Sequence, residues 1–335
     1  MLLEFGYRDC LNLSKVVIAI MLALAMIVGC HQPAIESSAD RPSRQDQTSE
    51  KSMDEPEAVA EKRSEEPPNS TARPVDSILE SIERWGGIYR RRNREAGAPI
   101  TVLLLNRSEI TDEGMEKLST LSGLRVLDLE STQITGSALR HLRNLAELET
   151  INLGDTGAND DGLKQLRDLN QLAGLALDRT EISDDGLASL KSLKQLESLN
   201  LSSTPITGEG LRHLSELQSL VALDLSFTKV EDGGVSHLSG LKSLRTLGLG
   251  RTRVTPECIQ YLMGLELQGL NLGGNALGDR AVDELSKLTS LKRLSLIGTG
   301  ISQSGVQKLR QALPSAVIQY ASPDRDTEKL TPNGA

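Results

Sequence analysis

Apolar residues recur along this chain with a period of 24 residues between positions 100 and 313. The copy that begins at Leu196 reads L-x-x-L-x-L-x-x-T-x-I-T-x-x-G-L-x-x-L-x-x-L-x-x. A repeat of this length indicates a solenoid, in which each unit buries its apolar face against its neighbours. Because a solenoid presents a long surface, we expect binding before catalysis. The nine copies are 24 residues apart, except for one step of 23, and begin at Ile100, Leu124, Leu148, Leu172, Leu196, Leu220, Leu244, Leu267 and Leu291.

Each repeat has seven positions that we predict to form the core, namely 1, 4, 6, 11, 16, 19 and 22. They hold Leu, Ile, Val or Met throughout, except for Ala158 and Ala312. Positions 4 and 6 alternate with polar neighbours and predict a short strand, whereas the spacing of three between positions 16, 19 and 22 predicts a helix or a 3₁₀ turn. Ser, Thr or Asn at position 12 favours a cap for that helix. Cys258 replaces the usual Gly at position 15, so we expect a buried structural thiol.

This pattern resembles the leucine-rich repeat superfamily, in particular the short bacterial repeats of the ribonuclease-inhibitor-like type. The resemblance covers residues 100–313. It implies an α/β fold, a curved horseshoe with parallel strands on the concave face and short helices on the convex face. The chain departs from the family at position 9, where Thr replaces the usual Asn or Cys in seven copies. We expect these hydroxyls to satisfy the loop backbone without forming a continuous asparagine ladder.

Both ends of the repeat array carry predicted caps. Residues 76–99 form the N-terminal cap, in which Asp76 to Arg94 is expected to be an amphipathic helix that Gly86-Gly87 interrupts. Trp85 is expected to cover the first repeat. At the other end, Ile318 falls on position 4 of a truncated tenth strand, so the repeat domain extends over 100–320 and is followed by a disordered tail, 321–335.

The N-terminus carries a targeting signal. Residues 16–28 are uncharged and apolar, a run that is short for a membrane span but suits the core of a signal peptide. The run ends in Ile27-Val28-Gly29-Cys30, which resembles the bacterial lipobox. The resemblance implies that residues 1–29 are removed and that Cys30 carries the lipid anchor. A simple secretory signal and an uncleaved span are the alternatives. His31 stands where an Asp often favours inner-membrane retention, so we expect the outer membrane of a bacterial envelope.

Residues 30–75 are predicted to be a disordered tether. This segment is rich in Ser, Pro and both signs of charge and has few apolar side chains to bury. Its length corresponds to a mean reach of about 35–40 Å. A tether of this kind would hold the repeat domain away from the membrane.

Composition excludes several kinds of function. The net charge of −9 argues against nucleic acid, because phosphate binding needs clustered Lys and Arg. Cys10, Cys30 and Cys258 are too far apart for a zinc pattern, and the sequence has no nucleophile elbow, phosphate loop or His-Glu-x-x-His motif. We therefore expect no metal, no cofactor and no enzymatic activity.

The concave face is the predicted binding surface, because strand positions 3, 5 and 7 point to it. These side chains are small and acidic to neutral, with Asp155, Arg179 and Arg251 at the rim. A shallow groove for a basic or polar partner is one interpretation, and an ordinary solvated surface is the other. A divalent ion between Asp128, Glu130 and Asp155 is a further alternative. The candidate residues are Asp128, Glu130, Asn152, Asp178, Asn200, Asp224, Phe227 and Asn271.

The sequence thus predicts an envelope-anchored lipoprotein whose repeat domain binds a protein partner in the cell envelope. A passive structural component of the envelope is one alternative, and a non-catalytic accessory subunit of an envelope enzyme is another. Reversing the charges of Asp178 and Asp224 is expected to abolish binding in the groove while leaving a structural role intact.

Overall fold

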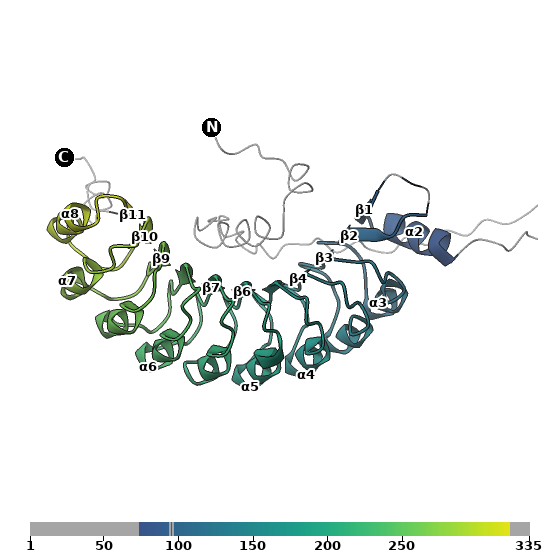
Figure 1. The fold of residues 1–335 in the computed structure, drawn as a ribbon, viewed down its shortest axis with the longest axis horizontal. Helices are drawn as coiled ribbons and strands as arrows, with labels where there is room; N and C mark the ends of the chain where they lie inside the picture. Colours follow the sequence, from purple (N-terminus) through teal and green to yellow (C-terminus); the bar gives the residue numbers. More distant parts are fainter. Residues whose placement is uncertain (1–73, 94, 96, 322–335) are drawn as a thin grey trace, which may run out of the picture.

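The computed structural model describes residues 74–93, 95 and 97–321. The predicted signal peptide, the lipid attachment site Cys30, the tether up to residue 73 and the tail from residue 322 lie outside the described residues. The described chain winds into an arc of stacked coils, with strands along the inner curve and short helices along the outer curve (Figure 1). The described residues contain no helix long and apolar enough to span a bilayer.

Ten parallel strands line the inner curve in chain order, one for each full repeat and one for the truncated tenth. The register aligns equivalent positions, so that Leu127 lies beside Ile151 and Ile151 beside Leu175. In most repeats the strand covers positions 3 to 5, one residue earlier than predicted. The strands are β2 (Ile100–Leu104), β3 (Val126–Asp128), β4 (Thr150–Asn152), β5 (Gly174–Ala176), β6 (Ser198–Asn200), β7 (Ala222–Asp224), β8 (Thr246–Gly248), β9 (Gly269–Asn271), β10 (Arg293–Ser295) and β11 (Val317–Gln319).

The outer curve consists of short α-helices and 3₁₀ helices of three to seven residues, as the spacing of three predicted. The last one, α8, is longer, with ten residues. Six of the seven Ser, Thr or Asn residues at position 12 accept a backbone N–H, and Thr111 does not. The elements are α3 (Asp112–Leu118), η2 (Gly136–His141), α4 (Asp160–Leu163), η3 (Lys164–Leu166), α5 (Asp184–Leu187), η4 (Ala188–Ser192), η5 (Glu209–Leu214), α6 (Asp232–Val235), η6 (Ser236–Leu238), η7 (Pro256–Leu262), η8 (Asp279–Ala281), α7 (Val282–Leu285) and α8 (Gln303–Ala312).

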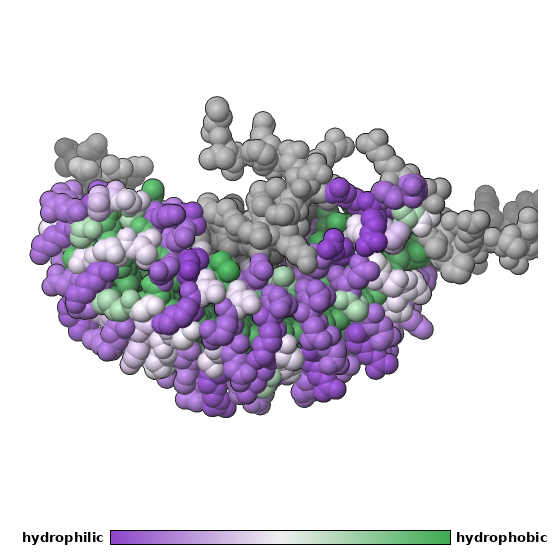
Figure 2. Space-filling view, viewed as in Figure 1, coloured by the Kyte–Doolittle hydropathy of each residue, from purple (hydrophilic) through white to green (hydrophobic). Residues whose placement is uncertain are grey.

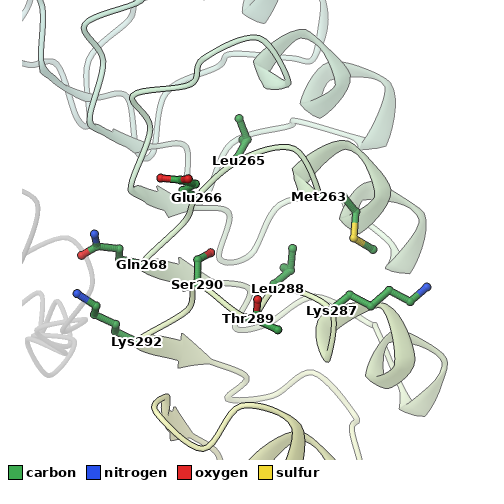
Figure 3. A pocket seen from close by; sticks show the side chains of 9 residues that line it. All are labelled: Met263, Leu265, Glu266, Gln268, Lys287, Leu288, Thr289, Ser290 and Lys292. Carbon is green, nitrogen blue, oxygen red and sulfur yellow. The ribbon is translucent and has the colours of Figure 1, made fainter.

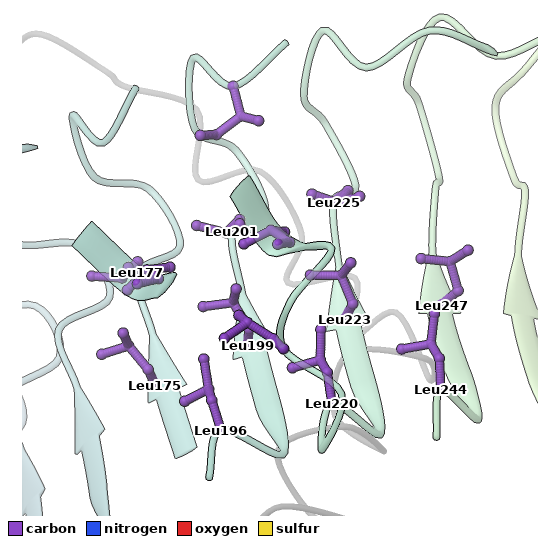
Figure 4. Packing of buried hydrophobic residues seen from close by; sticks show 14 of the residues in the cluster. Leu175, Leu177, Leu196, Leu199, Leu201, Leu220, Leu223, Leu225, Leu244 and Leu247 are labelled. Carbon is purple, nitrogen blue, oxygen red and sulfur yellow. The ribbon is translucent and has the colours of Figure 1, made fainter. Parts of the chain in front are cut away.

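The predicted core positions are buried in every repeat except at Leu121, which is half-buried, and Ala312, which is exposed. Equivalent leucines of neighbouring repeats, such as Leu199, Leu223 and Leu247, lie side by side along the strands (Figure 4). Ala312 is a correction: Leu313, 3% exposed, takes its place in the core. The reason is that α8 is a true α-helix, in which buried residues are spaced by three and then four, as in Val306, Leu309 and Leu313.

The N-terminal cap differs from its prediction. The helix, α2 (Pro74–Arg84), ends before Gly86, whose φ of +75° a residue with a Cβ adopts only with strain. The predicted break at Gly86-Gly87 is confirmed, but the helix does not resume up to Arg94, because β1 (Ile88–Arg91) pairs antiparallel with β2. Trp85 does cover the first repeat: a Cβ on Gly114 of α3 would lie 2.8 Å from its Cζ2 atom.

Threonine at position 9 donates its hydroxyl to the position 6 carbonyl of the same repeat in all seven copies, at 2.5–2.8 Å. Asn275 alone reaches across repeats, because its Nδ2 donates to Leu249 as well as Leu272 and its Oδ1 accepts from the Thr252 N–H. The expectation of satisfied loops without a continuous asparagine ladder is confirmed.

A second polar contact joins repeats on the convex side. An Asp at position 13 accepts both the backbone N–H and the hydroxyl of the Ser or Thr at position 12 of the next repeat. We call this arrangement the Asp clasp. It is absent where position 13 is Gly or Pro, as at Gly136, Gly208 and Pro256. The clasps are Asp112–Thr135, Asp160–Ser183, Asp184–Thr207, Asp232–Thr255 and Asp279–Ser302.

Candidate functional site

The predicted surface residues at position 5 fold back on their own strands. In each of five repeats, a side-chain oxygen accepts the N–H of position 7, at 2.9–3.1 Å. Asx turns of this kind end the strand and turn the chain towards the convex side. These side chains therefore shape the backbone as well as the surface. They are Asp128, Asn152, Asn200, Asp224 and Asn271.

Three of the predicted carboxylates are buried: Asp128 and Asp178 are 8% exposed and Asp224 is 5% exposed. Glycine in the neighbouring repeat provides the space, since a Cβ on Gly248 would lie 2.2 Å from Asp224 Oδ1 and one on Gly154 would lie 2.7 Å from Asp178 Oδ1. Burial raises the pKa of Asp224 above its usual value, although hydrogen bonds from Ser226 oppose the shift. Burial likewise raises the pKa of Asp178, against the opposing charge of Arg179.

Polar contacts connect the candidate residues of repeats 2 to 5 into one network. Asn152 Nδ2 lies 3.4 Å from Glu130 Oε2, and Asn200 Nδ2 donates to Asp178 Oδ1 at 2.9 Å. The Arg179 guanidinium joins the two halves, because it lies 3.1 Å from Glu130 and 3.0 Å from Asp178. The structure thus brings these five residues together, whereas Asn271 lies apart in repeat 8.

Position 8, at the rim, has a left-handed backbone in all nine repeats, and only Gly274 and Gly298 are glycines there. Bulky L-residues rarely adopt this conformation. The ladder between repeats enforces it: each position 8 N–H up to repeat 8 donates to the position 7 carbonyl of the next repeat, at 2.7–3.0 Å. The seven other residues are Arg107, Ser131, Asp155, Arg179, Ser203, Phe227 and Arg251, with φ between 51° and 61°.

Phe227 is the aromatic residue of this row and is 57% exposed. The Arg251 guanidinium lies 5.4 Å from the centre of its ring, within cation–π distance. Exposed aromatic and Arg side chains are the types that most often contribute binding energy at protein interfaces. Phe227 and Arg251 therefore form the best anchor among the predicted residues.

Metal binding receives no support from the geometry. Over residues 74–93, 95 and 97–321, no group of three or more His, Cys, Asp or Glu side chains is arranged to hold a metal. Asp155, part of the suggested divalent-ion site, instead accepts a hydrogen bond from Ser131 at 2.8 Å. Cys258 is fully buried, and burial raises the pKa of its thiol to about 12, as suits a structural residue.

Sequence reasoning missed the contribution of position 2 to this surface. Figure 3 shows Gln268 and Lys292, both at this position, pointing away from the helices at the starts of their strands. Arg245 occupies the same position in repeat 7, and Arg293 at position 3 is exposed beside Lys292. The residue at position 2 differs from repeat to repeat. This variability next to the strand is the signal that could have identified position 2 as part of the surface.

A shallow pocket of about 410 Å³ lies beside the shortened repeat. The missing residue is at position 24, so that Glu266 alone separates Leu265 from Leu267. Leu265 and Leu288 contribute to an apolar base, with Lys287, Thr289 and Ser290 around it (Figure 3). Glu266 is paired with Arg245 at 3.3 Å, and Lys287 with Glu284 at 2.6 Å.

The family model described as Leucine Rich repeat matches residues 99–119, 194–215 and 216–239. Together with one parallel sheet and one helical turn per repeat, this match decides the fold. The protein is a leucine-rich-repeat solenoid. The predicted α/β horseshoe is confirmed, and leucine-rich-repeat proteins generally mediate protein–protein interaction.

Solved structures resemble the leucine-rich-repeat solenoid at low sequence identity, and no curated protein matches its sequence. Internalin C2 of Listeria monocytogenes is 22% identical over 66% of this chain and 81% of its own, with a TM-score of 0.46. An internalin (inlF) of the same organism is 18% identical over 74% and 88%, with a TM-score of 0.41. The ectodomain of the Arabidopsis thaliana receptor kinase GASSHO1/SCHENGEN3, in complex with CASPARIAN STRIP INTEGRITY FACTOR 2, is 19% identical over 63% and 28%, with a TM-score of 0.46.

Proposed function

We propose that this protein is a lipid-anchored, non-catalytic binding module that holds a protein partner in the bacterial cell envelope on the concave face of its solenoid. The observation that carries the proposal is Phe227, a large apolar side chain that is 57% exposed in a left-handed backbone conformation. A bulky residue in such a conformation costs stability, on the order of 1–3 kcal/mol. A large exposed ring held in this conformation, on a face where most side chains are small or polar, favours a role in binding.

The concave face also suits binding because it is preformed. The ladder of backbone hydrogen bonds and the Asx turns fix its side chains before any partner arrives, so little ordering entropy is lost on association. The passive structural alternative has its own support, since the position 5 residues are engaged in these turns. The experiment therefore has to change side chains that face outward and leave the turns intact.

Glu130 and Phe227 meet this requirement, whereas Asp178 and Asp224 do not. The two aspartates are buried and hydrogen-bonded, so reversing their charges would damage the solenoid. We expect Glu130→Arg with Phe227→Ala to lose a partner that the wild type captures in cells after chemical crosslinking. Glu209→Arg with Met263→Ala changes exposed side chains outside the concave face and is expected to retain it.

The capture experiment also has outcomes that contradict the proposal. Equal capture by both double variants would move the interaction to the convex side or to the caps. Failure of the wild type to capture any partner would favour a passive structural component. Co-purification with an enzyme whose activity depends on the protein would favour an accessory subunit.

Lipid attachment at Cys30 is proposed from the lipobox resemblance of Ile27-Val28-Gly29-Cys30. We expect the protein to incorporate an alkyne-labelled fatty acid and to fractionate with membranes, in the outer more than the inner. Cys30→Ala should lose the label, because the lipid is attached through this thiol. Cys10→Ala is the matched control. Labelling that persists in Cys30→Ala would contradict the assignment.

A further inference from the structure

Charge on the concave face changes sign between repeats 6 and 7. At positions 2, 3, 5, 7 and 8, repeats 2 to 6 carry seven acidic side chains, of which Glu130, Asp155 and Glu197 are not buried, and two basic ones, Arg125 and Arg179. The same positions in repeats 7 to 9 carry four basic side chains and no acidic one. The acidic residues are Asp128, Glu130, Glu149, Asp155, Asp178, Glu197 and Asp224, and the basic ones are Arg245, Arg251, Lys292 and Arg293.

Ion pairs inside each half do not cancel this difference. Arg125 pairs with Glu149, and Arg179 pairs with Glu130 and Asp178, so both bases of the acidic half are already engaged. In the other half, Lys292 and Arg293 are exposed and form no ion pair with any described residue. Hydrophilic side chains dominate the visible surface of the arc, so the sign of charge distinguishes its halves better than hydropathy does (Figure 2).

Phe227 and Arg251 lie at the junction of the two halves. The ring belongs to the last acidic repeat and the guanidinium that stacks on it belongs to the first basic one. Beside them, Gly248 and Gly250 are buried, and the side chains of Asp224 and Asn271 lie over these two glycines. The exposed Phe227 ring is therefore the surface against which an apolar side chain of a partner can pack.

Dimensions set the length of a matching ligand. Strands in a sheet are about 4.8 Å apart, so the face from repeat 2 to repeat 9 spans about 34 Å. An extended chain rises about 3.3 Å per residue, so about ten residues cross the whole face. Basic residues reappear beyond the acidic half, at Arg90 and Arg107, and mark the other limit of the negative stretch.

We infer that the concave face binds an extended protein segment of about ten residues in which a basic block and an acidic block are separated by an apolar residue. The basic block lies over repeats 2 to 6, the apolar residue lies against Phe227, and the acidic block lies over repeats 7 to 9. This inference rests on the proposed function and adds the order of charges that a partner must have.

The test uses two labelled eleven-residue peptides of identical composition. One has four Lys, a central Leu flanked by Ser, and four Glu, and the other alternates Lys and Glu around the same centre. Fluorescence anisotropy with the full chain in detergent measures both dissociation constants. We expect the block peptide to bind at least tenfold more tightly than the alternating one, with an affinity that falls as salt rises.

Charge-swap variants assign each block to its half of the face. The variant Glu130→Lys with Glu197→Lys should bind the block peptide at least fivefold more weakly than the wild type does. The same variant should bind more tightly to a peptide in which Glu replaces the Lys block. The variant Lys292→Glu with Arg293→Glu should lower the affinity for the block peptide by a similar factor. Phe227→Ala should also lower the affinity for the block peptide, and the size of this loss should depend little on salt concentration.

Three results would overturn the inference. The first is equal affinity for the block and alternating peptides. The second is an affinity for a peptide with Lys as its only charged residue that equals the affinity for the block peptide. The third is no binding of the block peptide. Each of them leaves the proposed function standing if Glu130→Arg with Phe227→Ala still loses the partner captured in cells. Loss of that result as well would remove the concave face as a binding surface altogether.

Discussion

Asp224 has a buried carboxylate that accepts hydrogen bonds from Ser226. Its Oδ1 accepts the Ser226 N–H at 2.9 Å, and burial raises the pKa of the group. Asn holds the same position at Asn152 and Asn200, where Nδ2 contacts position 7 of the preceding repeat. Ser202 occupies that place beside Asp224, so an amide there would have a hydroxyl acceptor.

Asp224→Asn is therefore expected to raise the free energy of unfolding at pH 7. A carboxyl whose pKa is higher in the folded than in the unfolded state stabilises the fold below its unfolded value, about pH 4, and loses that contribution as pH rises through the folded value. The gain from the amide should accordingly grow from pH 4 to pH 7 in urea denaturation. A variant less stable than wild type at pH 7 would show that the buried charge is compensated.

Single residues were the hardest scale to predict from the sequence. The apolar frame identified almost every buried side chain, but nothing in it showed that position 5 folds back onto position 7. The left-handed backbone at position 8 was also hidden, because glycine, its usual sign, occurs there only at Gly274 and Gly298. Both features depend on hydrogen bonds to neighbouring positions or repeats, which a local pattern does not encode.

At the level of the element, the Asp clasp joins the short helix to the loop of the next repeat at five places. Asp184 accepts the Thr207 N–H at 2.9 Å and also its hydroxyl. Gly210 makes room for this carboxylate, since a Cβ there would lie 2.3 Å from Asp184 Oδ1. Asp184 stands in the first turn of its own helix, but its hydrogen-bond partner belongs to the following repeat.

Asp184→Ala should lower the free energy of unfolding by about 1–3 kcal/mol, because the Thr207 N–H and hydroxyl lose their acceptor. Asp185→Ala is the matched control: this neighbouring carboxylate is exposed and forms no clasp, so its loss should change stability by less than about 0.5 kcal/mol. Equal effects of both substitutions in chemical denaturation would mean that the clasp contributes no more than helix-terminal charge.

Element boundaries were predicted best where the repeat is regular. The period gave the parallel strands and helical turns to within about a residue. It failed at the ends, where β1 replaced the second half of the predicted helix and α8 shifted the core from Ala312 to Leu313. A terminal repeat has only one neighbour, so its packing follows the local chain more than the period.

For the whole molecule, the sequence was sufficient for the horseshoe and for its inner curve as the candidate surface. The order of charge along that surface was only partly visible, because position 2 was not assigned to it. The central claim is that partners bind on the inner curve and that the outer curve only supports it. Whether a site is used is a property of the complex and not of the repeat frame.

Photo-crosslinking from two single positions tests this claim most directly. A photoreactive amino acid replaces Ser202, at position 7 of the concave face, or Lys191, exposed on the convex side, in otherwise unchanged protein in cells. The account predicts a discrete crosslinked product from Ser202 and none from Lys191. A product from Lys191 with none from Ser202 would contradict it and place the binding surface on the helices.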